Sequence, residues 1–199
     1  MDCNDGSDLF PTAIKLIVAG GFGVGKTTFV GSVSEIEPLS TEELITAASI
    51  GTDDLDGVGD KGTTTVAMDF GRITLDSRHI LYLFGAPGQE RFWFMWDELS
   101  TGALGAVVLA DTRRLEDCFS AVDFFERRGI SFLVAVNEFD DAFRYNAEEV
   151  RSALDVKPHV PIVTCDARQP RSATATLVAL IEHLLSLPVP SASLWERLS

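Results

Sequence analysis

The sequence predicts an α/β domain with helices on both faces of a mostly parallel, six-stranded sheet. Six short apolar or alternating runs, typical of strands, alternate along the chain with segments of helical periodicity. A glycine-rich run follows the first strand and leads directly into a helical segment. With 199 residues and 46% hydrophobic content, the chain can bury one sizeable core without disulfides or a structural metal.

The expected elements follow in a regular order. The apolar run 13–19 predicts the first strand, and a helix-like segment begins at Thr28. Residues 65–73 alternate enough to form a strand, and 79–84 is a short apolar one. Beyond them, continuous apolar runs of the buried-strand type alternate with helical patterns. These strands are 103–110, 130–136 and 160–164, and the helices are 90–99, 115–128, 148–154 and 174–187.

Composition sets the limits of the domain. We expect a single domain over 12–187, a flexible N-terminus over 1–11 and a C-terminal tail over 188–199, because prolines follow the last helix. The segment 38–62 is rich in Gly, Asp and Thr and is the stretch we expect to be most flexible.

Charge and cysteine content exclude several function classes. The formal net charge of −14 argues against nucleic-acid binding and against attraction to anionic membranes. No apolar run approaches the length of a membrane span, and neither end carries a lipidation motif or a basic signal-peptide start, so we expect no direct membrane anchor. Three cysteines far apart in sequence suggest no disulfide framework, which favours the cytoplasm.

The run from Gly20 to Thr27 fits G-x-x-x-x-G-K-[ST], the phosphate-binding P-loop. Its glycines let backbone N–H groups converge on phosphate oxygens at the start of a helix. Lys26 is expected to reach the β- and γ-phosphates, and the Thr27 hydroxyl to ligate Mg²⁺. The predicted phosphate-binding residues are Gly20, Gly23, Val24, Gly25, Lys26, Thr27 and Thr28.

Two further runs are similar to the switch regions of Ras-like GTPases. Residues 65–70 resemble the strand whose leading threonine, here Thr65, closes over Mg²⁺ and the γ-phosphate. Residues 85–92 read G-A-P-G-Q-E-R-F and resemble the second switch, D-T-A-G-Q-E-R-F. The resemblance implies that Gly88 lies beside the γ-phosphate and that Gln89 orients the attacking water.

Two later runs resemble the guanine-binding motifs of the same superfamily. Asn137-Glu138-Phe139-Asp140 is similar to N-K-x-D, and Cys165-Asp166-Ala167-Arg168 stands in the place of the S-A-K loop. Asp140 can accept from the guanine N1–H and 2-amino group, a pair of donors that adenine lacks. The resemblance therefore implies that Asn137, Asp140, Asp166, Ala167 and Arg168 bind the base.

Within the superfamily, the chain most resembles bacterial members. Pro87, together with the missing aspartate before it, is similar to the gliding-motility type of small GTPase. The runs 64–71 and 134–137 look like those of the conservon-encoded ATP/GTP-binding proteins of actinobacteria. That resemblance implies a signalling switch whose partners are a roadblock/LC7-type protein and a sensor-kinase-like membrane complex, with recruitment to the membrane through a partner.

Two departures from the Ras-like pattern matter. Gly85 stands where an aspartate would support the water shell of Mg²⁺. Mg²⁺ must then depend on Thr27, Thr65 and phosphate oxygens, or on another carboxylate, for which Asp69 and Asp111 are candidates with a salt bridge or cap as the alternative role. We therefore expect a weaker dependence on Mg²⁺. Glu138 replaces the N-K-x-D lysine, which weakens the base site without removing its selective contact.

These residues predict a molecular switch that binds GTP or GDP with Mg²⁺ and slowly hydrolyses GTP, with Lys26 and Gln89 as catalytic residues. Hydrolysis should be slow because the chain offers no convincing arginine finger. The arginines considered for that role, and expected to be surface charges, are Arg72, Arg91, Arg113 and Arg114. The alternative is a nucleotide-binding adaptor with negligible hydrolysis that also accepts ATP, which Gly85 and Glu138 favour.

The segment after Gln89 predicts a partner surface. In a helix, Phe92, Met95, Trp96 and Leu99 fall on one stripe that can pack on the sheet. Trp93 and Phe94 lie off that stripe, and exposed adjacent aromatics are typical of interfaces. We expect these two residues to contact a protein partner, or a neighbouring loop to bury them.

Overall fold

A computed structural model of the chain describes residues 10–37, 39–45, 64–89, 92 and 94–188. The strands are β1 (Thr12–Gly20), β2 (Leu39–Ile45), β3 (Thr64–Thr74), β4 (His79–Gly85), β5 (Gly105–Ala110), β6 (Phe132–Asn137) and β7 (Ile162–Cys165). The helices are α1 (Lys26–Val33), α2 (Phe94–Ser100), α3 (Phe119–Arg128), α4 (Ala147–Leu154) and α5 (Pro170–Ser186), with a short helical turn η3 (Leu115–Cys118) before α3. The predicted flexible end 1–11 and tail 188–199 fall almost entirely outside the described residues.

The strands form one sheet in the order β2-β3-β4-β1-β5-β6-β7. Strands β4, β1, β5, β6 and β7 run parallel to their neighbours, whereas β3 is antiparallel to both β4 and β2. This topology confirms the predicted α/β fold with a mostly parallel sheet. All six predicted strands are present, and β2 adds a seventh at the edge.

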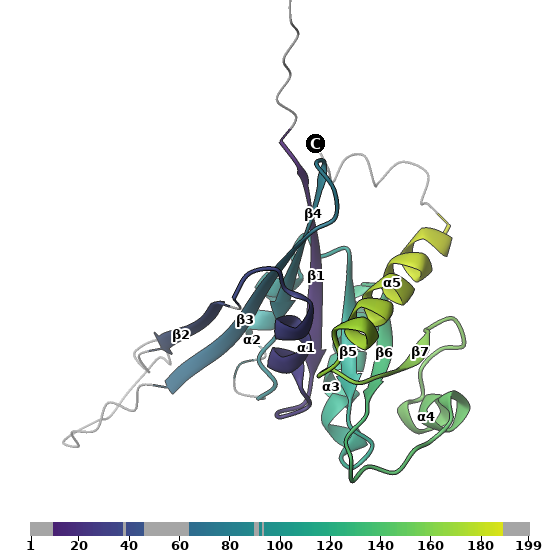
Figure 1. The fold of residues 1–199 in the computed structure, drawn as a ribbon. Coiled ribbons are helices and arrows are strands. Elements are labelled where there is room, and N and C mark those ends of the chain that lie inside the picture. The colour runs from purple at the N-terminus through teal and green to yellow at the C-terminus, as the bar shows by residue number, and fades with distance from the viewer. Residues whose placement is uncertain (1–9, 38, 46–63, 90–91, 93, 189–199) are drawn as a thin grey trace, which may run out of the picture.

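Helices cover both faces of the sheet (Figure 1), with α1 and α5 on one face and α2, α3 and α4 on the other. Both faces are therefore buried, which explains the continuous apolar runs. Successive residues of β1 serve opposite faces: Leu16 and Val18 pack with α1 and α5, whereas Ile17 and Ala19 pack with α2 and α3.

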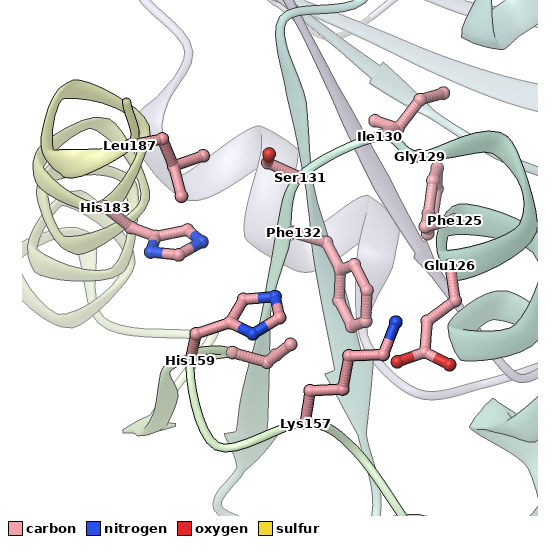
Figure 2. A pocket seen from close by; sticks show the side chains of 11 residues that line it. Phe125, Glu126, Gly129, Ile130, Ser131, Phe132, Lys157, His159, His183 and Leu187 are labelled. Carbon is pink, nitrogen blue, oxygen red and sulfur yellow. The ribbon is translucent and has the colours of Figure 1, made fainter. Parts of the chain in front are cut away.

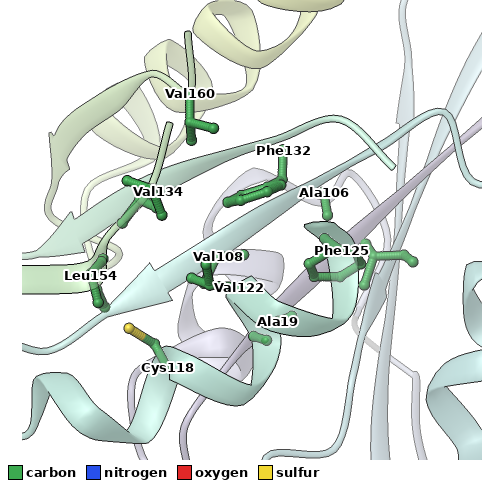
Figure 3. Close-up of a cluster of buried hydrophobic side chains, with 14 of the residues drawn as sticks. Ala19, Ala106, Val108, Cys118, Val122, Phe125, Phe132, Val134, Leu154 and Val160 are labelled. Carbon is green, nitrogen blue, oxygen red and sulfur yellow. The ribbon is translucent and has the colours of Figure 1, made fainter. Parts of the chain in front are cut away.

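The larger core cluster lies between the sheet and the face of α3 and α4 (Figure 3). Phe125 of α3 packs on Phe132 of β6 with ring centroids 6.0 Å apart, Val122 lies next to Val108 of β5, and Leu154 of α4 closes the cluster. These side chains are at most 6% exposed. The carboxyl ends of β1, β4, β5 and β6 are thereby held at one edge of the sheet, where a ligand of an open α/β sheet binds.

The structure corrects two boundaries. Part of the stretch 38–62, predicted to be flexible, is the strand β2, whose backbone pairs antiparallel with β3 from Leu39 opposite Phe70 to Ile45 opposite Thr64. The rest of that stretch lies outside the described residues. Helix α5 begins at Pro170 instead of at Thr174, because proline is compatible with the first turn of a helix.

Among the described residues, no helix combines the length and apolarity that a membrane crossing requires.

Candidate nucleotide-binding site

The P-loop joins β1, which ends at Gly20, to α1, which begins at Lys26. Gly20, Gly23 and Gly25 have φ values of 134°, 74° and 102°, which side-chain-bearing residues rarely adopt. A Cβ atom on Gly20 would also lie 2.3 Å from the carbonyl oxygen of Leu109. The predicted glycines are thus required for the loop to curl over the N-terminus of α1.

The Lys26 side chain folds back inside this loop. Its Nζ donates to the carbonyl oxygens of Gly20 at 3.0 Å and Gly21 at 2.6 Å. Burial lowers the pKa of Lys26 to about 8, although the nearby Asp69 carboxylate opposes the shift. An ammonium group held among carbonyl oxygens in this way can be transferred to phosphate oxygens at little cost in side-chain entropy.

Asp69 and Gly85 face each other across the β3–β4 pair, next to the P-loop. The Asp69 side chain is 6% exposed, and its Oδ2 accepts a 2.7 Å hydrogen bond from Thr27 Oγ1. A Cβ atom on Gly85 would come within 2.9 Å of both Asp69 Cβ and Asp69 Oδ2. The glycine therefore leaves room for a carboxylate supplied by the neighbouring strand.

Asp111, the other carboxylate considered for Mg²⁺, forms a salt bridge instead. Its side chain is 3% exposed and accepts from Arg113 Nη2 at 2.7 Å and Nε at 2.9 Å. Burial acts to raise the pKa of Asp111, but the hydrogen bonds and charge of Arg113 outweigh it and lower the pKa. Thr65 lies in β3 opposite Leu44, and its side chain is outside the described part of the chain.

The segment after β4 rests against the P-loop. A Cβ atom on Gly88 would lie 2.6 Å from Lys26 Nζ and 2.8 Å from the backbone of Gly21. Pro87 is anchored on the other side, since its carbonyl oxygen accepts from Trp96 Nε1 at 3.0 Å. The Gln89 carbonyl accepts from the Phe92 N–H at 3.0 Å. Through Gly88, the predicted second switch lies beside Lys26.

The helical stripe predicted after Gln89 is confirmed in part, because helix α2 begins at Phe94, after Phe92, and Met95 is half-buried. Phe92, Trp96 and Leu99 are 7%, 4% and 9% exposed, so they form part of the core or its edge. Phe94, off the stripe, is 64% exposed. Trp93 lies outside the described residues.

Asn137, at the end of β6, ties the predicted phosphate and base loops together. Its Nδ2 donates to the carbonyl oxygen of Val24 at 2.9 Å, and its Oδ1 accepts from the Ala167 N–H at 3.0 Å. The side chain is 5% exposed, and a Cβ on Gly25 would lie 2.6 Å from Asn137 Nδ2. The structure thus brings the P-loop, Asn137 and Ala167 together.

Arg168 is paired with Asp140, the carboxylate predicted to bind the base. Its Nη1 and Nη2 donate to the two oxygens of Asp140 at 3.2 and 3.1 Å. The same guanidinium donates from Nε to Asp166 Oδ1 at 2.9 Å. These hydrogen bonds lower the pKa of Asp140. Glu138, in place of the motif's lysine, forms an ion pair with Arg144.

A separate pocket of about 140 Å³ opens at the amino end of β6 (Figure 2). It is lined by Phe132 and by polar side chains that include Glu126, Lys157, His159 and His183. Phe132 and Asn137 stand at opposite ends of β6, roughly 17 Å apart at the rise of a strand. This pocket is therefore distinct from the P-loop edge of the sheet.

Sequence reasoning missed the part played by two arginines. Arg113 and Arg114 are exposed, as expected of surface charges, but Arg113 also binds Asp111, and Arg114 Nη2 donates to the Phe22 carbonyl oxygen at 3.1 Å. Their position directly after the strand β5, at the edge that carries the P-loop, was the available signal.

Comparison with known proteins agrees with this geometry. Residues 18–187 match the model of a family described as "Conserved hypothetical ATP binding protein". The chain belongs to this family. It is thus a nucleotide-binding P-loop NTPase, and the match covers all the motifs described above.

Two curated proteins are similar to the family member described here. An uncharacterized protein of Methanocaldococcus jannaschii is 30% identical over 129 residues, which are 64% of this chain and 71% of that protein. ADP-ribosylation factor-like protein 3 of Saccharomyces cerevisiae is 24% identical over 148 residues, 71% of this chain and 67% of that protein.

Solved structures show the same fold. The cytosolic domain of the T. maritima FeoB iron transporter in a GDP form has a TM-score of 0.64 and 15% identity, over 90% of this chain and 66% of that one. The FeoB G-domain from Methanococcus jannaschii has a TM-score of 0.57 and 13% identity, over 88% of this chain and 99% of that one. At such identities the likeness concerns the fold alone.

Proposed function

We propose that this P-loop protein is a molecular switch that binds GTP with Mg²⁺ and slowly hydrolyses it to GDP and phosphate. The observation that carries the choice of base is the Asp140–Arg168 pair. The end of the guanidinium presents two parallel N–H donors to the carboxylate, as the N1–H and 2-amino group of guanine do. Adenine offers an acceptor at N1 and no 2-amino group, so it cannot replace the two guanidinium donors at Asp140.

Mg²⁺ fits the residues beside the P-loop. The Thr27 hydroxyl and the Asp69 carboxylate, 2.7 Å apart, are the oxygen donors that this ion prefers, and a carboxylate that holds a metal-bound water suits its reluctance to dehydrate. When bound, the ion would neutralise charge on the β- and γ-phosphates. Thr27 and Thr65 would be its hydroxyl ligands. Asp69 would hold a metal-bound water, as an aspartate at the position of Gly85 does in Ras-like proteins.

In this proposal Lys26 leaves the carbonyl oxygens of Gly20 and Gly21 for the phosphates, and Gly88 moves away from it to admit the γ-phosphate. Gln89, beside Gly88, then orients the attacking water. Positioning and charge stabilisation supply the rate, and Arg114, which contacts the P-loop, is bonded there to the Phe22 carbonyl oxygen. Hydrolysis by the isolated protein is therefore slow.

Replacing Asp140 by asparagine tests the base assignment. The amide Nδ2 donates where the carboxylate accepted, so GDP should bind roughly 10- to 100-fold more weakly, the value of a hydrogen bond to a charged group, and xanthosine diphosphate should bind more tightly than GDP. Calorimetric titration with both nucleotides measures this inversion. Asp140 is exposed, so the fold should be unaffected.

Glu148→Gln, an equally exposed carboxylate on α4, is the matched control and should change neither affinity. An Asp140→Asn protein that still prefers GDP would contradict guanine reading.

Hydrolysis depends on Gln89 in this proposal. Gln89→Leu should lower single-turnover release of phosphate by about tenfold or more and leave GTP affinity nearly unchanged, because the glutamine acts on the attacking water and not on the bound ground state. Phosphate release that is negligible in the unmodified protein would favour the adaptor, for which Glu138 in place of lysine is the supporting observation.

We further propose that Phe94 belongs to a surface for a protein partner of the roadblock/LC7 type. Its exposure, next to a segment that γ-phosphate would reorder, supports this assignment. Phe94→Ala should weaken the affinity for such a protein by about tenfold or more in the GTP state, as measured by interferometry. Leu185→Ala, an exposed apolar residue on α5, is the control, and an unchanged affinity of Phe94→Ala ends the proposal.

A further inference from the structure

The turn from Asp111 to Arg114 contacts two loops of the proposed site. One is the loop 138–143 after β6, named the base loop, and the other is the P-loop. The turn follows β5 directly, and Asp111 is buried at the end of that strand. Asp111 holds Arg113 through its Oδ2, which accepts from Nη2 at 2.7 Å, and through its Oδ1, which accepts from Nε at 2.9 Å and from the Arg113 N–H at 3.0 Å. The guanidinium is thus fixed in orientation by a bidentate, charge-assisted pair with a buried carboxylate.

Three contacts connect this turn to the base loop. The Arg113 guanidinium carbon lies 3.9 Å from the centre of the Phe139 ring, and Nη1 donates to Asp141 Oδ1 at 2.6 Å. Thr112 Oγ1 donates to the Phe143 carbonyl oxygen at 2.8 Å. Phe139 and Asp141 flank Asp140 on either side, so Arg113 restrains the backbone that carries Asp140, whereas Arg168 bonds to its carboxylate.

One arginine further along, the turn contacts the P-loop. Arg114 Nη2 donates to the Phe22 carbonyl oxygen at 3.1 Å, and Nη1 lies 3.7 Å from Asp117 Oδ2. A Cβ atom on Gly21 would lie 2.5 Å from Asp117 Cβ, so the loop and the helical turn η3 are in close contact. Arg114 therefore supports the outer side of the loop whose inner N–H groups face phosphate.

We propose that Arg113 and Arg114 are positioning residues with separate tasks: Arg113 aligns Asp140 for the guanine base, and Arg114 holds the P-loop for the phosphates. This inference rests on the proposed guanine-nucleotide function. Glu138 stands where the motif has a lysine and is itself paired with Arg144, so this position brings no positive charge to either loop. The β5 turn supplies one cation to each loop, in addition to Arg168 at Asp140 and Lys26 inside the P-loop. A carboxylate held in place before the base arrives binds it with less loss of entropy.

Inosine diphosphate provides a readout, the ratio of its affinity to that of GDP, that a general loss of structure would leave unchanged. It differs from GDP only in lacking the 2-amino group, so the ratio of the two affinities reports the alignment of Asp140. The unmodified protein should bind GDP about tenfold or more tightly than inosine diphosphate. Arg113→Lys keeps a cation beside the buried Asp111 but loses the planar, bidentate fork and its stacking on Phe139.

In Arg113→Lys, the GDP to inosine diphosphate ratio should fall below about threefold. Phe139→Leu, which keeps an apolar side chain but removes the ring under the guanidinium, should lower the ratio in the same direction. Arg114→Ala should weaken both nucleotides equally, by roughly tenfold, and leave the ratio unchanged. Thermal unfolding of each variant establishes that it is folded at the temperature of the titration.

An unchanged ratio in both Arg113→Lys and Phe139→Leu would overturn the assignment of Arg113, and a ratio that falls in Arg114→Ala would overturn the separation of tasks. If the unmodified protein does not distinguish the two nucleotides at all, guanine reading itself fails, and this inference fails with it.

Discussion

Lys26→Met is expected to abolish nucleotide binding while leaving the free protein at least as stable as before. The ammonium group is the cation closest to the expected phosphates, and its loss should lower affinity by roughly 100- to 1,000-fold, the value of one or two charge-assisted hydrogen bonds. In the free protein that group is partly buried inside the P-loop, and this desolvation lowers its pKa from 10.5 to about 8. Below pH 8 it is charged both folded and unfolded, and burial then costs on the order of 3 kcal/mol.

Calorimetric titration with GDP and urea unfolding at pH 7 measure the two effects separately. The pH dependence gives a second test. Above pH 8 the free Lys26 loses its proton, whereas bound phosphate favours the ammonium form, so binding takes up a proton and affinity should fall by up to about tenfold per pH unit. Below pH 8 this dependence should vanish. A Lys26→Met protein that binds GDP normally would contradict the assignment of the P-loop.

Asp69→Asn should remove the dependence of nucleotide binding on Mg²⁺. In the proposed site the Asp69 carboxylate, bonded to Thr27, supports the ion, and its neutral isostere cannot do so to the same extent. We expect Mg²⁺ to tighten GDP binding by about tenfold or more in the unmodified protein and by less than about twofold in the variant. Affinity measured in EDTA should be the same for both. This expectation replaces the weaker dependence inferred from Gly85 alone.

Exchanging the two residues gives a sharper form of this test. Asp69 and Gly85 are direct cross-strand neighbours, so their side chains stand on the same face of the sheet. Gly85→Asp alone should destabilise the fold by about 1–3 kcal/mol, because its Cβ would meet Asp69 at 2.9 Å and two carboxylates would share one place. The double variant Asp69→Gly with Gly85→Asp should recover both stability and Mg²⁺ dependence. A double variant that stays independent of Mg²⁺ would contradict the role given to Asp69.

Local backbone requirements made much of the site predictable. The P-loop needs glycines at left-handed positions between a strand and a helix, and Gly20, Gly23 and Gly25 take those positions. Asn137 was recognisable for a similar reason, since it ends a buried strand at the same edge of the sheet as the P-loop. The motif spacing therefore indicated which residues meet before any tertiary contact was known.

Other features depend on tertiary register, which the sequence does not reveal by itself. That the Asp69 carboxylate, one of the two candidates, lies beside Gly85 follows from the antiparallel pairing of β3 with β4. The edge strand β2 was missed because its polar residues show no apolar alternation and its pairing with β3 comes from backbone hydrogen bonds. Arg113 and Arg114 are exposed as predicted, but their contacts with Phe139 and the Phe22 carbonyl oxygen depend on the fold.

We propose that this member of a family described as ATP-binding selects guanine over adenine nucleotides. Calorimetric titration of the unmodified protein with GDP and with ADP, both in the presence of Mg²⁺, tests it most directly. The Asp140 site predicts that GDP binds at least about 100-fold more tightly than ADP, since adenine has no pair of donors for the carboxylate. Equal affinities, or tighter binding of ADP, would contradict the account.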